Sequence, residues 1–199
     1  MNQAAAVQPS FEIRRVALIG AGVAGRSFAL ACAGAGFHVV LEDVMPANLR
    51  KAEADFAECA DLSQRGTAGR LELALTVEDA VREADVAIDF VPDELESKLE
   101  IFSMIDRMAP PKTILCTPSY ALSITDLASC VYRPELCVAV RGNLIRGDAA
   151  EPPVVRLLYP AAAAESTLTA VDKFLQALGV AVRRETDPEV PLLMKNAVM

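Results

Sequence analysis

The stretch that decides the fold is Val16-Ala-Leu-Ile-Gly-Ala-Gly-Val-Ala-Gly-Arg-Ser-Phe-Ala-Leu30. Its first four residues are apolar and predict a short buried strand. A glycine-rich turn follows, and Ala and Leu at helical spacing then predict a helix. Gly20, Gly22 and Gly25 therefore form G-x-G-x-x-G between a strand and a helix, which is the context that a dinucleotide-binding turn requires.

Each glycine of this turn has an expected task. Gly20 would permit the tight turn, Gly22 would let a pyrophosphate approach the backbone, and Gly25 would let the helix pack against the strand. Backbone N–H groups of the turn and of Val23 and Ala24 would then face the phosphates at the positive end of the helix.

An acidic pair follows the second apolar run. Phe37-His-Val-Val-Leu41 predicts a strand, and it ends in Glu42-Asp43. An acid about 20 positions after such a turn accepts hydrogen bonds from an adenosine ribose. Asp43 is the better candidate and Glu42 the second. A carboxylate there would repel a 2′-phosphate, and no arginine follows directly, so NAD is favoured over NADP. The alternative is a strand-end acid that merely faces solvent.

Strand-like and helix-like segments alternate along the rest of the chain, with Thr76 expected as a helix cap. The alternation predicts an α/β fold, a doubly wound and mostly parallel sheet of the Rossmann type in a single domain. We expect a disordered leader at 1–10, the domain at 11–187, and an apolar helix within 188–199. Further strands are expected at 71–76, 86–91, 113–116, 136–140, 154–158 and 180–182, and helices at 46–57, 77–84, 94–108, 123–128, 163–178 and 191–199.

Composition excludes several classes of function. The chain has 199 residues, 53% hydrophobic, and a net charge of −8, which suits one globular domain and argues against nucleic acid or an anionic membrane as partner. No apolar run is long enough to span a bilayer. Five cysteines without a C-x-x-C pair and one histidine make a metal site unexpected and indicate a reducing, cytoplasmic compartment.

Beyond these patterns the chain resembles a known family, the NAD-binding domain of 3-hydroxyacyl-CoA dehydrogenases, from about Arg15 to the C-terminus and without the C-terminal helical domain. The resemblance implies that Asp43 is the ribose-binding acid and that Asp93 and Lys98 lie near the nicotinamide half of NAD. It also places Asn196 on the asparagine of a family motif. A lysine one helical turn past an acid is also a common solvent-face pair. The matching segments are Gly20–Gly25, Val39–Asp43, Ala84–Lys98, Ile114–Ala128 and the strand after Arg133-Pro-Glu.

The family's catalytic set does not carry over. The resemblance implies a serine, a histidine base and a glutamate, and Tyr120, Arg141 and Arg156 stand at those positions. Arginine cannot act as a base at neutral pH. The single histidine, His38, opens the second strand on the adenosine side, where we expect a surface or strand-edge residue.

Two interpretations of the replaced set stay open. Two guanidiniums and a phenol near the nicotinamide would suit a small carboxylate or phosphate ligand. Alternatively the pocket is disused, and the arginines face solvent or pair with Asp148 and Glu151. The candidate catalytic residues are Tyr120, Arg141, Asn196 and Arg156.

The sequence therefore predicts an NAD(H)-binding protein of one of two kinds. It is an oxidoreductase with an altered site for a small carboxylate or acyl substrate, in which Tyr120 or a water relays the proton, or it is a non-catalytic sensor or subunit. The apolar residues of 188–199 predict packing on the protein's own core, a homodimer, or a partner chain.

Overall fold

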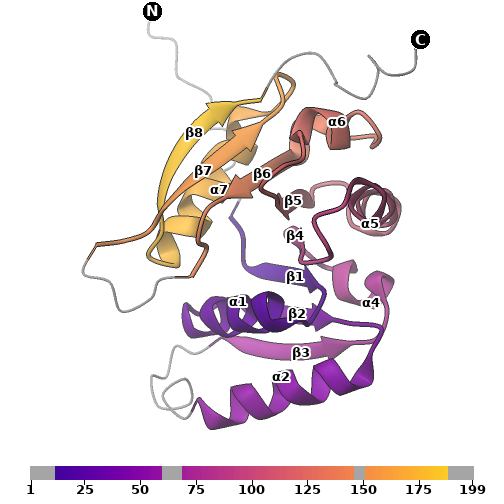
Figure 1. The fold of residues 1–199 in the computed structure, drawn as a ribbon, viewed down its shortest axis with the longest axis vertical. Helices are drawn as coiled ribbons and strands as arrows, with labels where there is room; N and C mark the ends of the chain where they lie inside the picture. Colours follow the sequence, from indigo (N-terminus) through magenta and orange to yellow (C-terminus); the bar gives the residue numbers. More distant parts are fainter. Residues whose placement is uncertain (1–11, 60–68, 146–150, 188–199) are drawn as a thin grey trace, which may run out of the picture.

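The computed structural model describes residues 12–59, 69–145 and 151–187. They form one eight-stranded sheet in the order β3-β2-β1-β4-β5-β6-β7-β8, with helices on both faces (Figure 1). The strands are β1 Arg15–Ile19, β2 His38–Glu42, β3 Arg70–Ala74, β4 Val86–Asp89, β5 Ile114–Pro118, β6 Cys137–Arg141, β7 Val154–Tyr159 and β8 Ala181–Thr186. The helices are α1 Val23–Gly34, α2 Pro46–Glu58, α4 Val77–Val81, α5 Leu95–Met108, α6 Ile124–Ala128, α7 Glu165–Ala177 and the short 3₁₀ turn η1 Pro134–Leu136.

The sheet is parallel except at one pair. β6 and β7 run antiparallel, and β7 and β8 are parallel again. The prediction of a doubly wound, mostly parallel sheet is confirmed. The strand order reverses beside β1, between β1 and β4, and such a reversal is where open α/β sheets place their ligands.

Two hydrophobic layers separate the sheet from its helices. One contains Phe28 of α1, Leu49 of α2 and Phe174 of α7. The other contains Val81 of α4, Phe102 of α5 and Leu127 of α6. α1, α2 and α7 therefore cover one face, and α4, α5 and α6 cover the opposite face (Figure 1).

Local sequence explains where several helices begin. Thr76 accepts a hydrogen bond from the Asp79 N–H at the start of α4, which confirms the predicted cap. Ser123 does the same for α6 through the Asp126 N–H. Predicted element limits differ from the observed ones by a few residues, as frayed ends generally do. The expected leader at 1–10 and helix within 188–199 lie outside the described residues.

Candidate functional site

The glycine turn adopts the geometry that its spacing predicts. Gly20 has φ +105°, a value that L side chains rarely adopt. A Cβ on Gly25 would lie 1.9 Å from the carbonyl oxygen of Gly20, so only glycine lets α1 approach β1 this closely. A Cβ on Gly22 would meet no atom within 4 Å. The space next to Gly22 is therefore open.

The first turn of α1 has no side-chain cap. Gly22 is the N-cap residue, and the first turn contains no acidic residue. Val23 is 75% exposed, and Ala24 is exposed as well. Because the first N–H groups of a helix lack intrahelical partners, this end offers donors and a positive dipole to an anion. The open turn fits a pyrophosphate.

Asp43 is tied to this turn. Its Oδ2 accepts hydrogen bonds from the Ala21 N–H at 2.8 Å and from Asn48 Nδ2 at 3.1 Å. Its Oδ1 accepts one from the Met45 N–H at 2.7 Å. A carboxylate has about four acceptor positions, so Oδ1 keeps capacity for one more donor. Asp43 thus fixes the turn beside the end of β2 and retains a free acceptor there.

Glu42, the second candidate, is in a different environment. Its side chain is only 3% exposed, and its Oε1 has no hydrogen-bond partner among the described residues. Burial, with the nearby charge of Asp43, raises the pKa of Glu42 from its usual 4.5 to about 7. Asp43 remains the candidate with contacts to the turn.

Lys98 does not lie on a solvent face, which makes the solvent-face alternative wrong. It is 1% exposed, and its Nζ donates to Asp89 Oδ1 at 2.5 Å and to the Pro118 carbonyl at 3.0 Å. Asp89 is fully buried at the end of β4. Burial raises the pKa of Asp89 to about 6, although the charge of Lys98 acts in the opposite direction. The pair joins α5 to the ends of β4 and β5.

Residues 119–123, which connect β5 to α6, are held by charged side chains; we call them the 119–123 loop. Asp93 Oδ2 accepts a hydrogen bond from the Tyr120 N–H at 2.9 Å. Arg141, at the end of β6, donates from Nε to the Ser119 carbonyl at 3.2 Å and from Nη2 to the Leu122 carbonyl at 2.8 Å. Asp93, Lys98 and Arg141 thus converge on this loop and on Pro118, which directly precedes it.

The pKa of Asp93 reflects the same contacts. Partial burial acts to raise it, but hydrogen bonds from Ser119 and from the Tyr120 and Ala121 N–H groups, with the charge of Lys98, lower the pKa below its usual value. Asp93 is therefore ionised at neutral pH and suited to holding the loop.

The far end of the loop is held by Asp187, which directly follows β8. Asp187 Oδ2 accepts hydrogen bonds from Ser123 Oγ at 2.5 Å and from the Thr125 N–H at 3.0 Å. Asp187 is 5% exposed. The end of β8 is thereby fixed to the start of α6.

The other predicted site residues are placed as follows. Tyr120 is 74% exposed. Arg156 is the register partner of Arg141 across β6 and β7, and its Nη1 lies 3.4 Å from Glu185 Oε2. Asn196, like Asp148, lies outside the described residues. His38 begins β2 with its Nε2 3.1 Å from Glu72 Oε1, and it does not reach the 119–123 loop, because β2 begins at the opposite end of the sheet.

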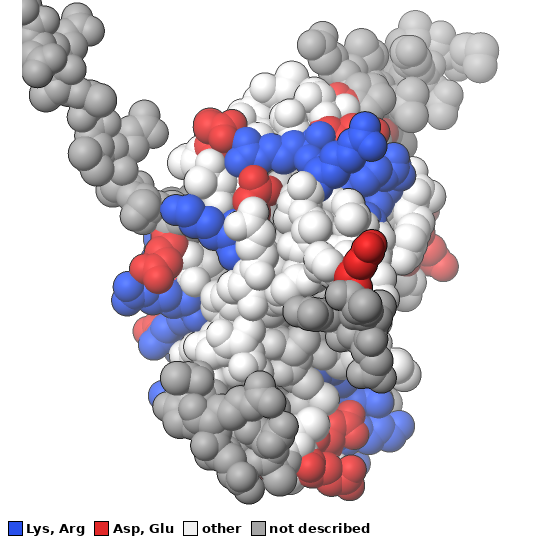
Figure 2. Space-filling view, turned by 90° about the vertical axis from the view of Figure 1, so that its left-hand side faces the viewer, with Lys and Arg blue, Asp and Glu red and all other residues white. Residues whose placement is uncertain are grey.

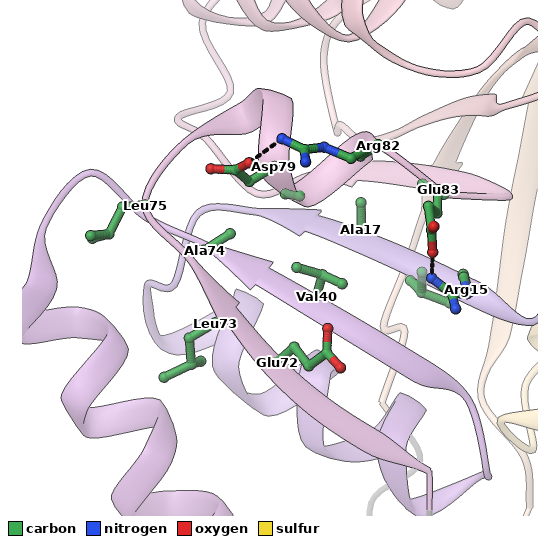
Figure 3. A pocket seen from close by; sticks show the side chains of 13 residues that line it. Arg15, Ala17, Val40, Glu72, Leu73, Ala74, Leu75, Asp79, Arg82 and Glu83 are labelled. Carbon is green, nitrogen blue, oxygen red and sulfur yellow. Dashed lines mark hydrogen bonds and ion pairs between the residues drawn. The ribbon is translucent and has the colours of Figure 1, made fainter.

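A separate pocket of about 440 Å³ lies between α4 and the strands β1, β2 and β3 (Figure 3). Ala17, Val40 and Ala74 are among its apolar lining residues. Charged side chains around it pair with one another, Arg15 with Glu83 and Arg82 with Asp79. Because the pocket reaches Arg15 at the start of β1, it is distinct from the glycine turn at the end of that strand.

Two kinds of feature are absent from the part of the chain that the structure describes. Within residues 12–59, 69–145 and 151–187, no group of three or more His, Cys, Asp or Glu side chains could hold a metal ion. In the same ranges, no helix has the length and apolar character needed to cross a bilayer.

Sequence reasoning missed two buried acids that organise the site. Asp89 interrupts the apolar run Val86-Ala-Ile-Asp-Phe-Val91, and an acid inside such a run is a signal that a buried cation pairs with it. Asp187 had no comparable signal, because its partners lie more than sixty positions away in the chain.

Comparisons with known proteins identify relatives of this chain. Residues 15–141 match the family model "3-hydroxyacyl-CoA dehydrogenase, NAD binding domain". A Bacillus subtilis (strain 168) protein named "Probable 3-hydroxybutyryl-CoA dehydrogenase" is 31% identical over 139 residues, which cover 65% of this chain and 48% of that protein. The "5-formyl-3-hydroxy-2-methylpyridine 4-carboxylate 5-dehydrogenase" of Mesorhizobium japonicum is 26% identical over 94% of this chain and 62% of its own length.

A solved structure shares the fold. The (S)-3-hydroxybutyryl-CoA dehydrogenase from Ralstonia eutropha matches with a TM-score of 0.75 at 23% identity, covering 89% of this chain and 65% of that one. The chain thus spans about half to two thirds of the length of these relatives.

Proposed function

Since the chain belongs to the 3-hydroxyacyl-CoA dehydrogenase family through its NAD-binding domain, we propose that it holds NAD(H) as a sensor or subunit and does not oxidise 3-hydroxyacyl-CoA unaided. NAD is the cofactor of this domain, and the uncapped start of α1 with Asp43 is where its pyrophosphate and adenosine ribose would bind. When bound, NAD supplies a hydride acceptor; every other group of the reaction must come from protein or substrate.

One observation carries the proposal. Arg141 occupies the position at which the resemblance places the histidine base, and its guanidinium is held on the carbonyls of Ser119 and Leu122. Hydride transfer from an alcohol requires removal of the hydroxyl proton, and an arginine stays protonated at neutral pH. The loop contact gives Arg141 a structural role instead of that of a base.

A second candidate function is an oxidoreductase with an altered site for a small carboxylate or acyl substrate. Its support is the pairing of Arg141 with Arg156 in register, next to the loop that carries the exposed Tyr120. In this alternative Tyr120 or a water relays the proton. The relative from Mesorhizobium japonicum acts, by its name, on a pyridine carboxylate.

Partner and location belong to the proposal as well. The apolar sequence of 188–199 supports a homodimer or a partner chain contacted through this segment. Cysteine usage supports a cytoplasmic location. Light scattering of the full chain, compared with a variant that ends at 187, tests the first point; identical monomeric masses would contradict it.

The main test separates binding from turnover. NADH fluorescence is titrated with the protein, NADPH serves as the comparison, and acetoacetyl-CoA and a panel of keto and hydroxy acids are then assayed. We expect NADH to bind at least about tenfold more tightly than NADPH, because Asp43 repels a 2′-phosphate.

Binding without any turnover supports the first candidate, and turnover of a small acid supports the second. Turnover of acetoacetyl-CoA by the protein alone contradicts the proposal. Failure to bind either dinucleotide contradicts both candidates.

A further inference from the structure

Three arginines lie directly opposite one another on neighbouring strands. Arg141 of β6 is the register partner of Arg156 of β7, and Arg156 is in turn the partner of Arg183 of β8. Residues opposite each other in a sheet project from the same face, here the face away from α7. We propose that this arginine row binds a small multivalent anion, with its phosphate or carboxylate groups lying along the three guanidiniums.

The three guanidinium groups of the arginine row carry more positive charge than the carboxylates bonded to them neutralise. Like charges directly opposite each other on adjacent strands are destabilising. Arg141 is held by backbone carbonyls, which carry no net charge. Among the described residues, no hydrogen bond or ion pair engages Arg183, and Glu185 is the one carboxylate that the row holds, 3.4 Å from Arg156. An anion would relieve the repulsion.

The next residue shows what a neutralised arginine looks like in the same strand. Arg184 points to the opposite face, where its guanidinium donates to Glu165 Oε1 at 2.6 Å and to Asp172 Oδ2 at 2.8 Å. Carboxylates of α7 thus neutralise Arg184, whereas on the face of the row Glu185 pairs with Arg156 and Asp187 is engaged by Ser123 and Thr125. Figure 2, which shows the side of the molecule at the left of Figure 1, has basic side chains gathered in a band across its upper part.

The spacing of the row indicates the size of the ligand. Neighbouring strands lie about 4.8 Å apart, so three guanidiniums span roughly 10 Å. A molecule with two or three anionic groups matches that length, and the guanidinium fork binds carboxylate or phosphate through paired hydrogen bonds. Arg156 and Arg183 are exposed, whereas Arg141 is half-buried beside the 119–123 loop. A compact molecule reaches all three, whereas an extended acidic protein segment would contact only the two exposed residues.

This inference deepens the second candidate function by naming its ligand class and by adding Arg183, but the binding itself does not depend on NAD. The test is calorimetric titration of the full chain with citrate and with pyrophosphate, in phosphate-free buffer, with acetate as the monovalent comparison. Citrate and pyrophosphate distinguish a carboxylate source from a phosphate source, and binding of either supports the site. We expect the better of them to bind about tenfold more tightly than acetate, and to weaken as salt rises.

Substitutions locate the site. Arg183→Gln and Arg156→Gln should each weaken binding about fivefold, as loss of an exposed charge-assisted contact does. Arg107→Gln removes the same charge from exposed α5 and should leave binding unchanged. NADH titration of Arg183→Gln should give wild-type affinity. Loss of NADH binding with citrate binding retained would count against the proposed function alone.

Two results would overturn the proposal. One is equal anion affinity in wild type and Arg183→Gln, with both folded by circular dichroism. The other is binding of a hexaglutamate peptide without binding of citrate or pyrophosphate, which would make the row a protein interface.

Discussion

At the glycine turn, the N–H groups at the start of α1 face solvent without a side-chain cap, and Asp43 keeps one acceptor position free. At the 119–123 loop, the reverse holds, because Asp93, Arg141 and Asp187 bind the loop's own polar groups. Unsatisfied polar groups near an open surface are what a ligand can use, whereas satisfied groups mainly stiffen the protein. The comparison separates an open half, the glycine turn, whose backbone groups can recruit a ligand, from an occupied half, the 119–123 loop, whose backbone groups are already bound by side chains of the protein.

The largest effect should come from the occupied half. Lys98→Met leaves Asp89 buried without its cation, which costs about 3–5 kcal/mol in the free energy of unfolding. Lys112→Met is the matched control, because Lys112 also pairs with an aspartate, Asp85, but its side chain is 60% exposed; it should cost less than about 1 kcal/mol. Urea denaturation at pH 7 measures both.

The double variant Asp89→Leu/Lys98→Met removes both charges and should recover most of the loss, because an apolar pair replaces a buried ion pair at little cost. A Lys98→Met protein within about 1 kcal/mol of wild type would show that the pair does not hold the two strands together.

The open half is tested by two glycines. Gly25→Ala places a methyl group 1.9 Å from the Gly20 carbonyl and should cost about 3 kcal/mol. Gly22→Ala places the same group in open space at φ −63°, so stability should change by less than about 0.5 kcal/mol. Gly22→Ala should nevertheless weaken NADH binding, because the methyl group occupies the space that the pyrophosphate needs. If folded Gly22→Ala binds NADH with normal affinity, the pyrophosphate does not bind at this turn.

Glu42 borders the open half and gives a pH-dependent test. Its pKa is raised from 4.5 to about 7 in the folded state, so folding favours the protonated form. Its contribution to stability is therefore present below pH 4.5 and is lost as the pH rises to 7, by at most about 3 kcal/mol.

Glu42→Gln lacks this titration. The difference in unfolding free energy between Glu42→Gln and wild type should shift in favour of the variant between pH 5 and 7, and stay constant above pH 8. Thermal or urea unfolding across that range measures it. Parallel pH profiles for the two proteins would mean that Glu42 titrates normally.

The smallest effect is expected at Arg141. Arg141→Met removes two hydrogen bonds to loop carbonyls and should cost about 1–2 kcal/mol, and amide hydrogen exchange should quicken in residues 119–123. Arg156→Met, at the register partner, should leave exchange in the loop unchanged because Arg156 does not contact it. Unchanged amide hydrogen exchange in Arg141→Met would show that Arg141 does not stabilise the 119–123 loop.

Local sequence patterns were sufficient to predict those parts of the structure that depend on residues close together in the chain. The glycine turn, the cap at Thr76 and most strands follow from spacing and residue type, and all three features appear in the structure. The close approach at Gly25 could be predicted because its nearest contact is the carbonyl oxygen of Gly20, five residues earlier, whereas the backbone next to Gly20 is that of Phe90, which is distant in the chain.

Contacts between distant strands could not be predicted in the same way. Lys98 follows the acidic Asp93 by about one helical turn, yet its side chain is buried and pairs with Asp89 of β4. Arg141 matched a catalytic position by resemblance, but its partners are backbone carbonyls, which no sequence pattern marks. The arginine row required the antiparallel direction of β7 and the register of β8, which alternation of elements does not specify.

The two outermost strands share one further property. β3 carries Arg70 and Glu72, and β8 carries Arg183, Arg184 and Glu185. An edge strand exposes unpaired backbone groups that can template addition of another strand, and charged side chains are a common protection against it. Charge on β8 thus guards the open sheet against aggregation. Substitutions of Arg183 that keep the position polar preserve this protection, whereas an apolar residue there would invite strand addition and insolubility.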